Sequence, residues 1–224
     1  MARRAPVERS LGIRCWGDVT EDRIRLAVVF SHAPHGSTPR PICRSRLHCV
    51  FSKLLGKTTS RKAMDVAASI RGAKVADHAQ LHALFEELDR LHRDSAPWLL
   101  QRSDRDPRPR EWLETLLASH NAALFVADVG LCVGLATVHL RDAPSFEMFI
   151  RQQHAVIDDL VVHPDWRRRG IARRLCEACE EWALERKASW VEVTVHEFNA
   201  EAYDFYASVG FGTTTRKMRK PLRG

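Results

Sequence analysis

The sequence of 224 residues predicts a mixed α+β fold in which a mostly antiparallel sheet is combined with helices. Two apolar patterns support this: some segments repeat at helical spacing, and others alternate residue by residue as strands do. Their order along the chain is β-α-α-β-β-β-α-β-α-β. Three consecutive strands favour an antiparallel meander, and the helix between the fourth and fifth strands predicts one right-handed parallel crossover.

The first half of this order begins with a strand at residues 68–71 and a helix at residues 77–93. Asp77 and Gln80 have the spacing of a capping box at the start of that helix. Its apolar stripe consists of Leu81, Leu84, Phe85, Leu88 and Leu91. A second helix is expected around Trp112, Leu113, Leu116 and Leu117. Two strands, at residues 122–128 and 131–140, then form a hairpin.

The second half begins with the apolar segment AVIDDLVV at residues 155–162, which predicts the fourth strand. A helix should start after Gly170, because Leu175, Cys179 and Trp182 follow at helical spacing. Alternating residues at 189–196 predict the fifth strand. Asn199 is a good N-cap for a last helix, whose stripe is Ala202, Phe205, Tyr206 and Val209. Gly210 ends that helix before a final strand.

The basic turn between the fourth strand and its helix has the form Arg-x-x-Gly-x-Ala, with Arg167, Gly170 and Ala172 at the fixed positions. The first N–H groups of a helix have no partners within the helix, and they lie at the positive end of its dipole. A diphosphate can therefore bind there. Gly170 lets the backbone come close, and Arg167, Arg168 and Arg169 add positive charge.

Two segments together resemble the GNAT superfamily of acetyl-CoA-dependent N-acetyltransferases. IDDLVVHPDWRRRGIARRL is similar to the acetyl-CoA motif of that family, and EFNAEAYDFYASVGF is similar to its C-terminal Asn/Tyr motif. The resemblance covers about residues 64–222 and is to the bacterial-type members, including polyamine and small-amine acetyltransferases. It implies a GNAT-like sheet with helices on both faces, and an enzyme that moves an acetyl group from acetyl-CoA to an amine.

The resemblance also implies residues that hold acetyl-CoA. The diphosphate would lie on Arg167, Arg168, Arg169, Gly170, Ile171 and Ala172. The pantetheine arm would pair with the free backbone edge at Leu160, Val161 and Val162, where two parallel strands diverge. Asn199 matches the residue that hydrogen-bonds this arm, and Tyr206 matches the tyrosine that faces the thioester sulfur.

Acetyl transfer to an amine needs a base, because an alkylammonium is almost fully protonated at neutral pH, and it needs an acid for the departing thiolate. Tyr206 is the candidate acid. Asp158 and Asp159 are candidates for the basic end, since aspartate is uncommon in strands, and alternation would direct them to opposite faces. Val156 stands where some GNAT enzymes carry a glutamate base, so a water relay is an alternative. No cysteine falls in the predicted reacting region, which disfavours a covalent intermediate.

By analogy with the family, the first two helices and residues 141–154 would line the acceptor site. The candidate substrate-binding residues are Glu86, Asp89, His92, Trp98 and Asp158, and Glu147 is a further candidate. An acidic cleft would attract a cationic amine. The favoured acceptor is a small primary amine, attacked directly in a ternary complex. Protein N-terminal or lysine acetylation is the alternative, and a non-catalytic acyl-CoA-binding module is another.

Charge divides the chain into two parts. Residues 1–63 contain 13 Lys and Arg against 4 Asp and Glu, whereas residues 64–224 contain 22 against 24. The basic pI of about 9.4 therefore belongs to the N-terminal extension, which disfavours nucleic acid as a ligand of the catalytic domain. Sequence translated from a start codon placed too early best accounts for residues 1–63, and a disordered basic arm comes next. A transit peptide is a third alternative.

No apolar run approaches the roughly 18 residues that a membrane span needs, so we expect a soluble cytoplasmic protein without a membrane partner. Cys176 and Cys179 share a helix face, but without a second pair they do not predict a zinc site, so no metal is expected. A homodimer is compatible with the resemblance. Neither the identity of the amine nor the length of the acyl group follows from the sequence.

Overall fold

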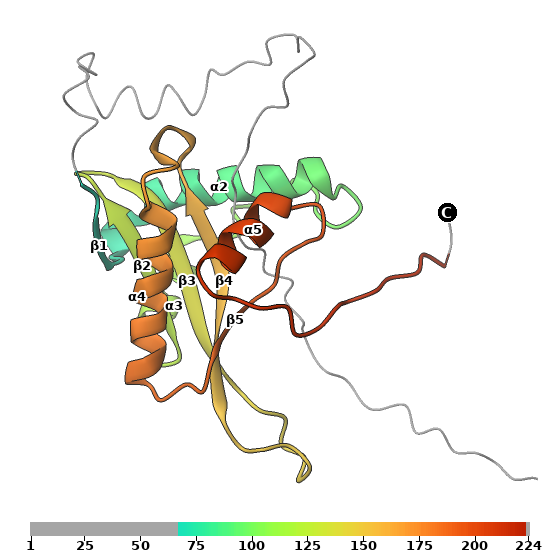
Figure 1. Ribbon diagram of the computed structural model, residues 1–224. Helices are drawn as coiled ribbons and strands as arrows, with labels where there is room; N and C mark the ends of the chain where they lie inside the picture. The colour runs from blue at the N-terminus through green and yellow to red at the C-terminus, as the bar shows by residue number, and fades with distance from the viewer. Residues whose placement is uncertain (1–66, 223–224) are drawn as a thin grey trace, which may run out of the picture.

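The computed structural model describes residues 67–222, and the expectations for residues 1–63 lie outside this range. The predicted fold class is confirmed: a five-stranded sheet in the order β1-β2-β3-β4-β5 is combined with helices (Figure 1). The strands are β1 (Ser69–Gly72), β2 (Ala122–Asp128), β3 (Cys132–Asp142), β4 (Gln153–Val162) and β5 (Val191–Val193). The first four pair antiparallel, and β5 pairs parallel to β4.

Helices cover both faces of the sheet. The long helices are α2 (His78–Ser95), α3 (Arg110–Ala118), α4 (Ile171–Glu185) and α5 (Ala200–Ser208). Short 3₁₀ turns, η2 (Val75–Asp77) and η3 (Pro164–Trp166), precede α2 and α4. One apolar core lies between the sheet and α4 with α5, and a second lies between the sheet and α2 with α3. Figure 1 shows α4 upright in front of the sheet and α2 crossing behind it.

Asp77 performs a different task from the predicted capping box. Its carboxylate accepts hydrogen bonds from the Arg71 guanidinium at 2.8 Å and from the Lys74 backbone N–H at 2.7 Å, and it does not cap α2. Gln80 instead accepts from the backbone N–H of Cys132 at 2.7 Å. The capping-box prediction is therefore wrong, because both side chains find partners on other elements of the sheet and its entry turn.

A bulge in β4 changes the direction of one side chain. Thr137 is paired with Asp159, and the next residue of β3, Val138, is paired with Ile157, so Asp158 is the extra residue. An extra residue in one strand breaks the regular alternation of faces. Ile157 and Leu160 both belong to the core under α4, which directs Asp158 and Asp159 together toward α2 and α3. The prediction that the two aspartates face opposite sides is therefore wrong.

The pairing of β4 with β5 is short. It ends at Ile157 with Val193, and no β5 residue pairs with positions 158–162 in the part of the chain described here. The predicted gap between diverging parallel strands is thus present. The final strand predicted after α5 is not formed within residues 211–222, where Arg216, Lys217, Arg219, Lys220 and Pro221 offer little apolar surface to bury.

Candidate acetyl-CoA and acceptor site

The turn that leads into α4 has an unusual backbone. Arg168 has a φ of 61° and Gly170 a φ of 73°, both in the left-handed region, and Gly170 is the N-cap of α4. Nothing lies within 4 Å of the position that a Cβ on Gly170 would occupy. The N–H groups of Ile171, Ala172 and Arg173 are in the first turn, where no carbonyl of the helix can accept from them. The geometry expected for an anion site is present.

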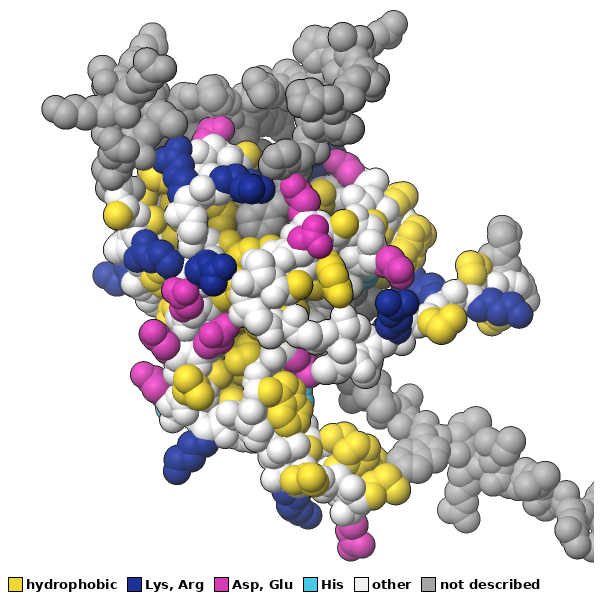
Figure 2. Space-filling model, in the orientation of Figure 1, with side chains coloured by type: hydrophobic (Ala, Val, Ile, Leu, Met, Phe, Trp, Pro, Cys, Tyr) yellow, Lys and Arg dark blue, Asp and Glu magenta, His cyan; other side chains and the backbone are white. Residues whose placement is uncertain are grey.

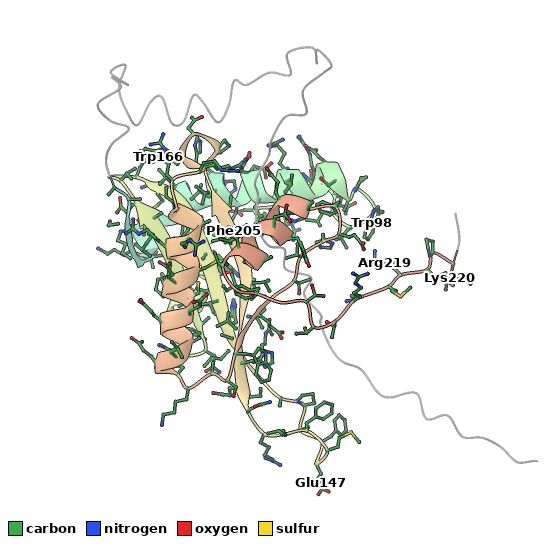
Figure 3. All side chains as sticks on the ribbon, viewed as in Figure 1. Trp98, Glu147, Trp166, Phe205, Arg219 and Lys220 are labelled. Carbon is green, nitrogen blue, oxygen red and sulfur yellow. The ribbon has the colours of Figure 1, made fainter. Side chains whose placement is uncertain are left out.

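A pocket of about 600 Å³ opens at this turn, between α4 and α5. Its lining includes Arg168, Gly170 and Ala172 from the turn and α4, and Phe205 and Ser208 from α5. Figure 2 shows the hollow with basic side chains on one side and acidic ones on the other. Trp166 and Phe205, labelled in Figure 3, come from the two sides of the pocket. Glu201 and Asp204 also line it, so a diphosphate there would lie closer to the α4 side.

The three arginines of the turn have different surroundings. Arg167 is buried, and its guanidinium donates to the Val162 carbonyl at 3.0 Å and to Glu87 at 3.2 Å. Burial lowers the pKa of Arg167, and the negative charge of the Glu87 carboxylate partly offsets this lowering. Arg169 lies over the Trp166 ring at 4.8 Å. Arg167 thus shapes the turn from inside, whereas Arg168 is the arginine best placed at the pocket lining.

The β4 segment at the pocket is apolar and buried. Leu160, Val161 and Val162 are all buried, and of these three Val162 lines the pocket. Because β5 does not pair with this part of β4, one edge of its backbone faces the gap. Amide groups of a pantetheine arm would fit that edge.

Asn199 and Tyr206 both belong to α5, the first as its N-cap and the second as a buried residue of the helix. Asn199 caps α5, with its side-chain oxygen accepting from the Ala202 N–H at 3.1 Å. Tyr206 is buried, and its hydroxyl has no hydrogen-bond partner among the described residues. Burial, together with nearby Cys176, Cys179 and Asp159, raises the pKa of Tyr206 well above its usual value. Its phenol therefore stays protonated at physiological pH.

The two cysteines of α4 correct one expectation. No cysteine was expected near the reacting region, yet Cys176 and Cys179 lie in the same core cluster as Tyr206. Burial raises the pKa of the Cys176 thiol to about 12, and that of the Cys179 thiol well above its usual value. Since the thiolate is the nucleophilic form, neither thiol is activated for attack.

On the opposite side of β4, the aspartates belong to a charged network. Asp159 accepts from the Thr137 hydroxyl at 2.7 Å, and the Arg108 guanidinium lies 4.0 Å away. Asp158 contacts Nδ1 of His139 at 2.5 Å, with Arg141 3.9 Å away. Both carboxylates are almost completely buried. Their negative charge is therefore shared with neighbouring cations before any amine arrives.

The predicted acceptor residues are only partly brought together. Asp89 joins the network, because Arg108 donates two hydrogen bonds to it, at 2.7 and 3.1 Å. Glu86 is half exposed and pairs with Arg93. Trp98 is exposed, at the far end of α2, with the Arg219 guanidinium 4.2 Å above its ring. Glu147 lies at the tip of the β3–β4 hairpin, away from the others (Figure 3).

His92 is fully buried rather than open to the acceptor. Its Nδ1 lies 2.9 Å from the Leu88 carbonyl, and its ring packs edge-on against His196 and Phe198, in the segment before α5. Burial lowers the pKa of His92, so the ring is neutral at neutral pH. This environment makes His92 part of the contact between α2 and the segment that leads into α5.

Sequence reasoning missed Glu87, Arg108 and His139. Glu87 and Arg108 lie in polar segments that resemble an ordinary helix surface and an ordinary linker, and only the packing reveals their buried partners. His139 had a usable signal. It stands in an apolar strand that pairs with the Asp158–Asp159 strand, so a cross-strand contact could have been anticipated.

Comparisons with known proteins agree with this geometry. Residues 81–211 match the model of the acetyltransferase (GNAT) family. An N-acetyltransferase of Archaeoglobus fulgidus, itself described as uncharacterized, is 33% identical over 116 residues, which are 51% of this chain and 72% of the relative. The chain belongs to the GNAT family. It is an acetyl-CoA-dependent N-acetyltransferase, with acetyl-CoA as its co-substrate.

Solved structures share the fold at lower identity. A Bacillus halodurans protein, crystallised as a tetramutant, has a TM-score of 0.64 and 23% identity, covering 69% of this chain and 99% of that one. An aminoglycoside acetyltransferase from an uncultured soil metagenomic sample, in complex with sisomicin, has a TM-score of 0.54 and 23% identity, covering 71% and 99%. No helix within residues 67–222 is long and apolar enough to cross a bilayer.

Proposed function

We propose that this enzyme transfers the acetyl group of acetyl-CoA to a small primary amine by direct attack in a ternary complex. The observation that carries the proposal is the edge of β4 at residues 158–162 that β5 leaves unpaired, which ends at the pocket lined by Val162, Gly170 and Phe205. In this arrangement the N–H groups after Gly170 bind the diphosphate, with Arg168 beside them. The β4 backbone at residues 160–162 binds the pantetheine arm.

Tyr206 is the proposed acid. Its hydroxyl is held without a competing hydrogen-bond partner among the described residues, and its raised pKa keeps the proton available for a departing thiolate. Direct attack is favoured over a covalent enzyme intermediate, because the thiols of Cys176 and Cys179 are held in their protonated form by burial. Most of the acceleration would come from orientation, which can contribute about 7 to 11 kcal/mol.

A cationic acceptor is favoured by the three carboxylates that face α2 and its link to α3. Arg108 contacts Asp89 and lies 4.0 Å from Asp159, and Arg141 lies 3.9 Å from Asp158, so three carboxylates stand against two arginines in this network. The sisomicin-bound structural neighbour acts on an aminoglycoside, and this supports polyamines and aminoglycosides as the first amines to test.

The test is a panel of amines assayed by release of free CoA from acetyl-CoA. The panel contains spermidine, free amino acids, kanamycin and short peptides with a free N-terminus or a lysine. Turnover with a small amine and none with peptides supports the proposal. Turnover confined to peptides would replace it with protein N-terminal or lysine acetylation.

A further inference from the structure

His139 lies beside the β4 bulge, on the face of the sheet that carries both aspartates. It is paired with Val156 on β4, one position past the bulge, and its Nδ1 lies 2.5 Å from Oδ2 of Asp158. A carboxylate that faces Nδ1 of a histidine fixes the proton on that nitrogen. This leaves Nε2 as the basic atom, on the other side of the ring.

The side chain of His139 is more exposed to solvent than those of Asp158 and Asp159. The side chains of Asp158 and Asp159 are 6% and 4% exposed, whereas that of His139 is 20% exposed. Arg141, another charged neighbour of Asp158, is half exposed, but a guanidinium does not act as a base. An amine that approaches this face therefore meets the imidazole before either carboxylate.

The carboxylates of Asp158 and Asp159 also already have partners in the protein. The Asp159 carboxylate accepts a hydrogen bond from the Thr137 hydroxyl at 2.7 Å, and the Asp159 backbone N–H donates to the same Thr137 oxygen at 3.0 Å. Arg108 lies 4.0 Å from Asp159 and is bonded to Asp89. A carboxylate held in this way would have to give up a partner in order to accept a proton from the substrate.

We propose that His139 is the general base that deprotonates the acceptor amine, and that Asp158 is the positioning residue that holds its ring. The proposal rests on the proposed function, because it needs an amine acceptor at this face. It replaces the direct aspartate base and the water relay as the first proton acceptor. It also gives the buried Asp158 at the bulge a role.

The acceptor ammonium gives one proton to Nε2 of His139, and the neutral amine then forms the new C–N bond with the thioester carbonyl carbon. The C–S bond breaks, and its electron pair leaves on the CoA sulfur, which takes the proton of Tyr206. The second proton of the attacking nitrogen restores the tyrosine. The imidazolium releases its proton to water, so one proton is liberated for each acetyl group transferred.

The first test needs no acceptor. In the full-length protein, long-range ¹H–¹⁵N correlation spectra report which nitrogen of each histidine carries the proton. We expect the neutral form of His139 to be protonated at Nδ1, and Asp158→Ala to abolish that preference. A neutral His139 protonated at Nε2, with Nδ1 bare, would overturn the proposal.

The second test is kinetic and uses the best amine from the panel. His139→Asn places an amide near the position of Nδ1, so it can still donate to Asp158 but has no basic Nε2. General bases contribute about 10²- to 10⁴-fold, so kcat/KM should fall by at least about 100-fold. The acid limb of its pH profile should disappear, while acetyl-CoA affinity stays unchanged.

His120→Asn is the matched control. It is the same substitution at an exposed histidine in the loop between α3 and β2, outside the segments expected to line the acceptor site. Its kcat/KM should stay within about twofold of the original, and a His139→Asn variant that behaves the same way would contradict the proposal. If the original protein binds acetyl-CoA but acetylates no amine, the proposed function fails, and the tautomer measurement still decides the role of the His139–Asp158 pair.

Discussion

Arg167 and Glu87 form a buried ion pair at 3.2 Å, although 80 residues separate them in the sequence, and each side chain is only 8% exposed. The pair joins the turn before α4 to the middle of α2. Arg167 also donates to the Val162 carbonyl at the end of β4, so one guanidinium fixes three elements around the turn. This contact sets the shape of the loop from which the diphosphate-binding N–H groups project.

We predict that Glu87→Ala lowers the free energy of unfolding by about 3 kcal/mol, because it leaves the buried Arg167 charge without its carboxylate. Glu86→Ala, at the adjacent and half-exposed position, should cost less than about 1 kcal/mol, although Glu86 also pairs with an arginine. Urea unfolding of both variants measures the difference. Equal losses would show that the Arg167–Glu87 pair adds nothing beyond a surface contact.

Gly170 should matter through its backbone conformation. Its φ of 73° is costly for any other residue, so Gly170→Ala should lower the free energy of unfolding by about 1 to 2 kcal/mol. It should also weaken CoA binding, since the strain is relieved by moving the N–H groups that follow. Gly212→Ala is the control, because Gly212 has equal space around it and no positive φ. Calorimetric titration with CoA and urea unfolding check both effects.

Tyr206→Phe should separate catalysis from stability. The Tyr206 hydroxyl has no hydrogen-bond partner among the described residues, so its removal should leave the free energy of unfolding unchanged or slightly raised. By contrast, kcat should fall by about 100-fold or more, because the thiolate loses its acid. Tyr203→Phe, on the exposed face of the same helix, should leave kcat unchanged. Unchanged turnover in Tyr206→Phe would remove this residue from the mechanism.

Burial of His92 predicts an acid-sensitive fold. Burial lowers the pKa of His92 from its usual 6.5, so the unfolded chain binds the proton more readily than the folded one. Stability is therefore complete above about pH 6.5 and falls as the pH drops toward the folded-state value, by up to about 1.4 kcal/mol per pH unit. His92→Gln should reduce this slope between pH 7 and 5, whereas His120→Gln, at an exposed position, should not. Identical slopes in both variants would refute the prediction.

The order of the elements could be predicted because periodicity is local. The apolar stripe of α2 and the alternating residues of β2 and β3 can each be recognised within a single segment of the sequence. Turns such as Val129-Gly130 mark where one segment ends and the next begins. The short β5 was also anticipated in position, although only Val191–Val193 pair with β4. The prediction of a last strand was wrong, because its basic residues offer no apolar face to bury and Pro221 lacks the backbone N–H that a strand donates.

The features of the candidate site that depend on backbone geometry could be predicted from the sequence. Gly170, the β4 edge and the Asn199 cap follow from chain geometry that the sequence encodes directly. The aspartates were assigned to the wrong faces, because a bulge is a property of two paired strands and leaves no mark in one of them. The role of Arg108 becomes visible only once distant segments have packed together, whereas His139 could have been anticipated from the strand that pairs with β4.

The most direct measurement of the central claim is a calorimetric titration of the full-length protein with CoA, repeated with Gly170→Ala. We predict saturable binding of CoA at one site per chain, and weaker binding of CoA to Gly170→Ala. Absence of binding, or equal affinity in both proteins, would contradict the assignment of the α4 N-terminus as the diphosphate site.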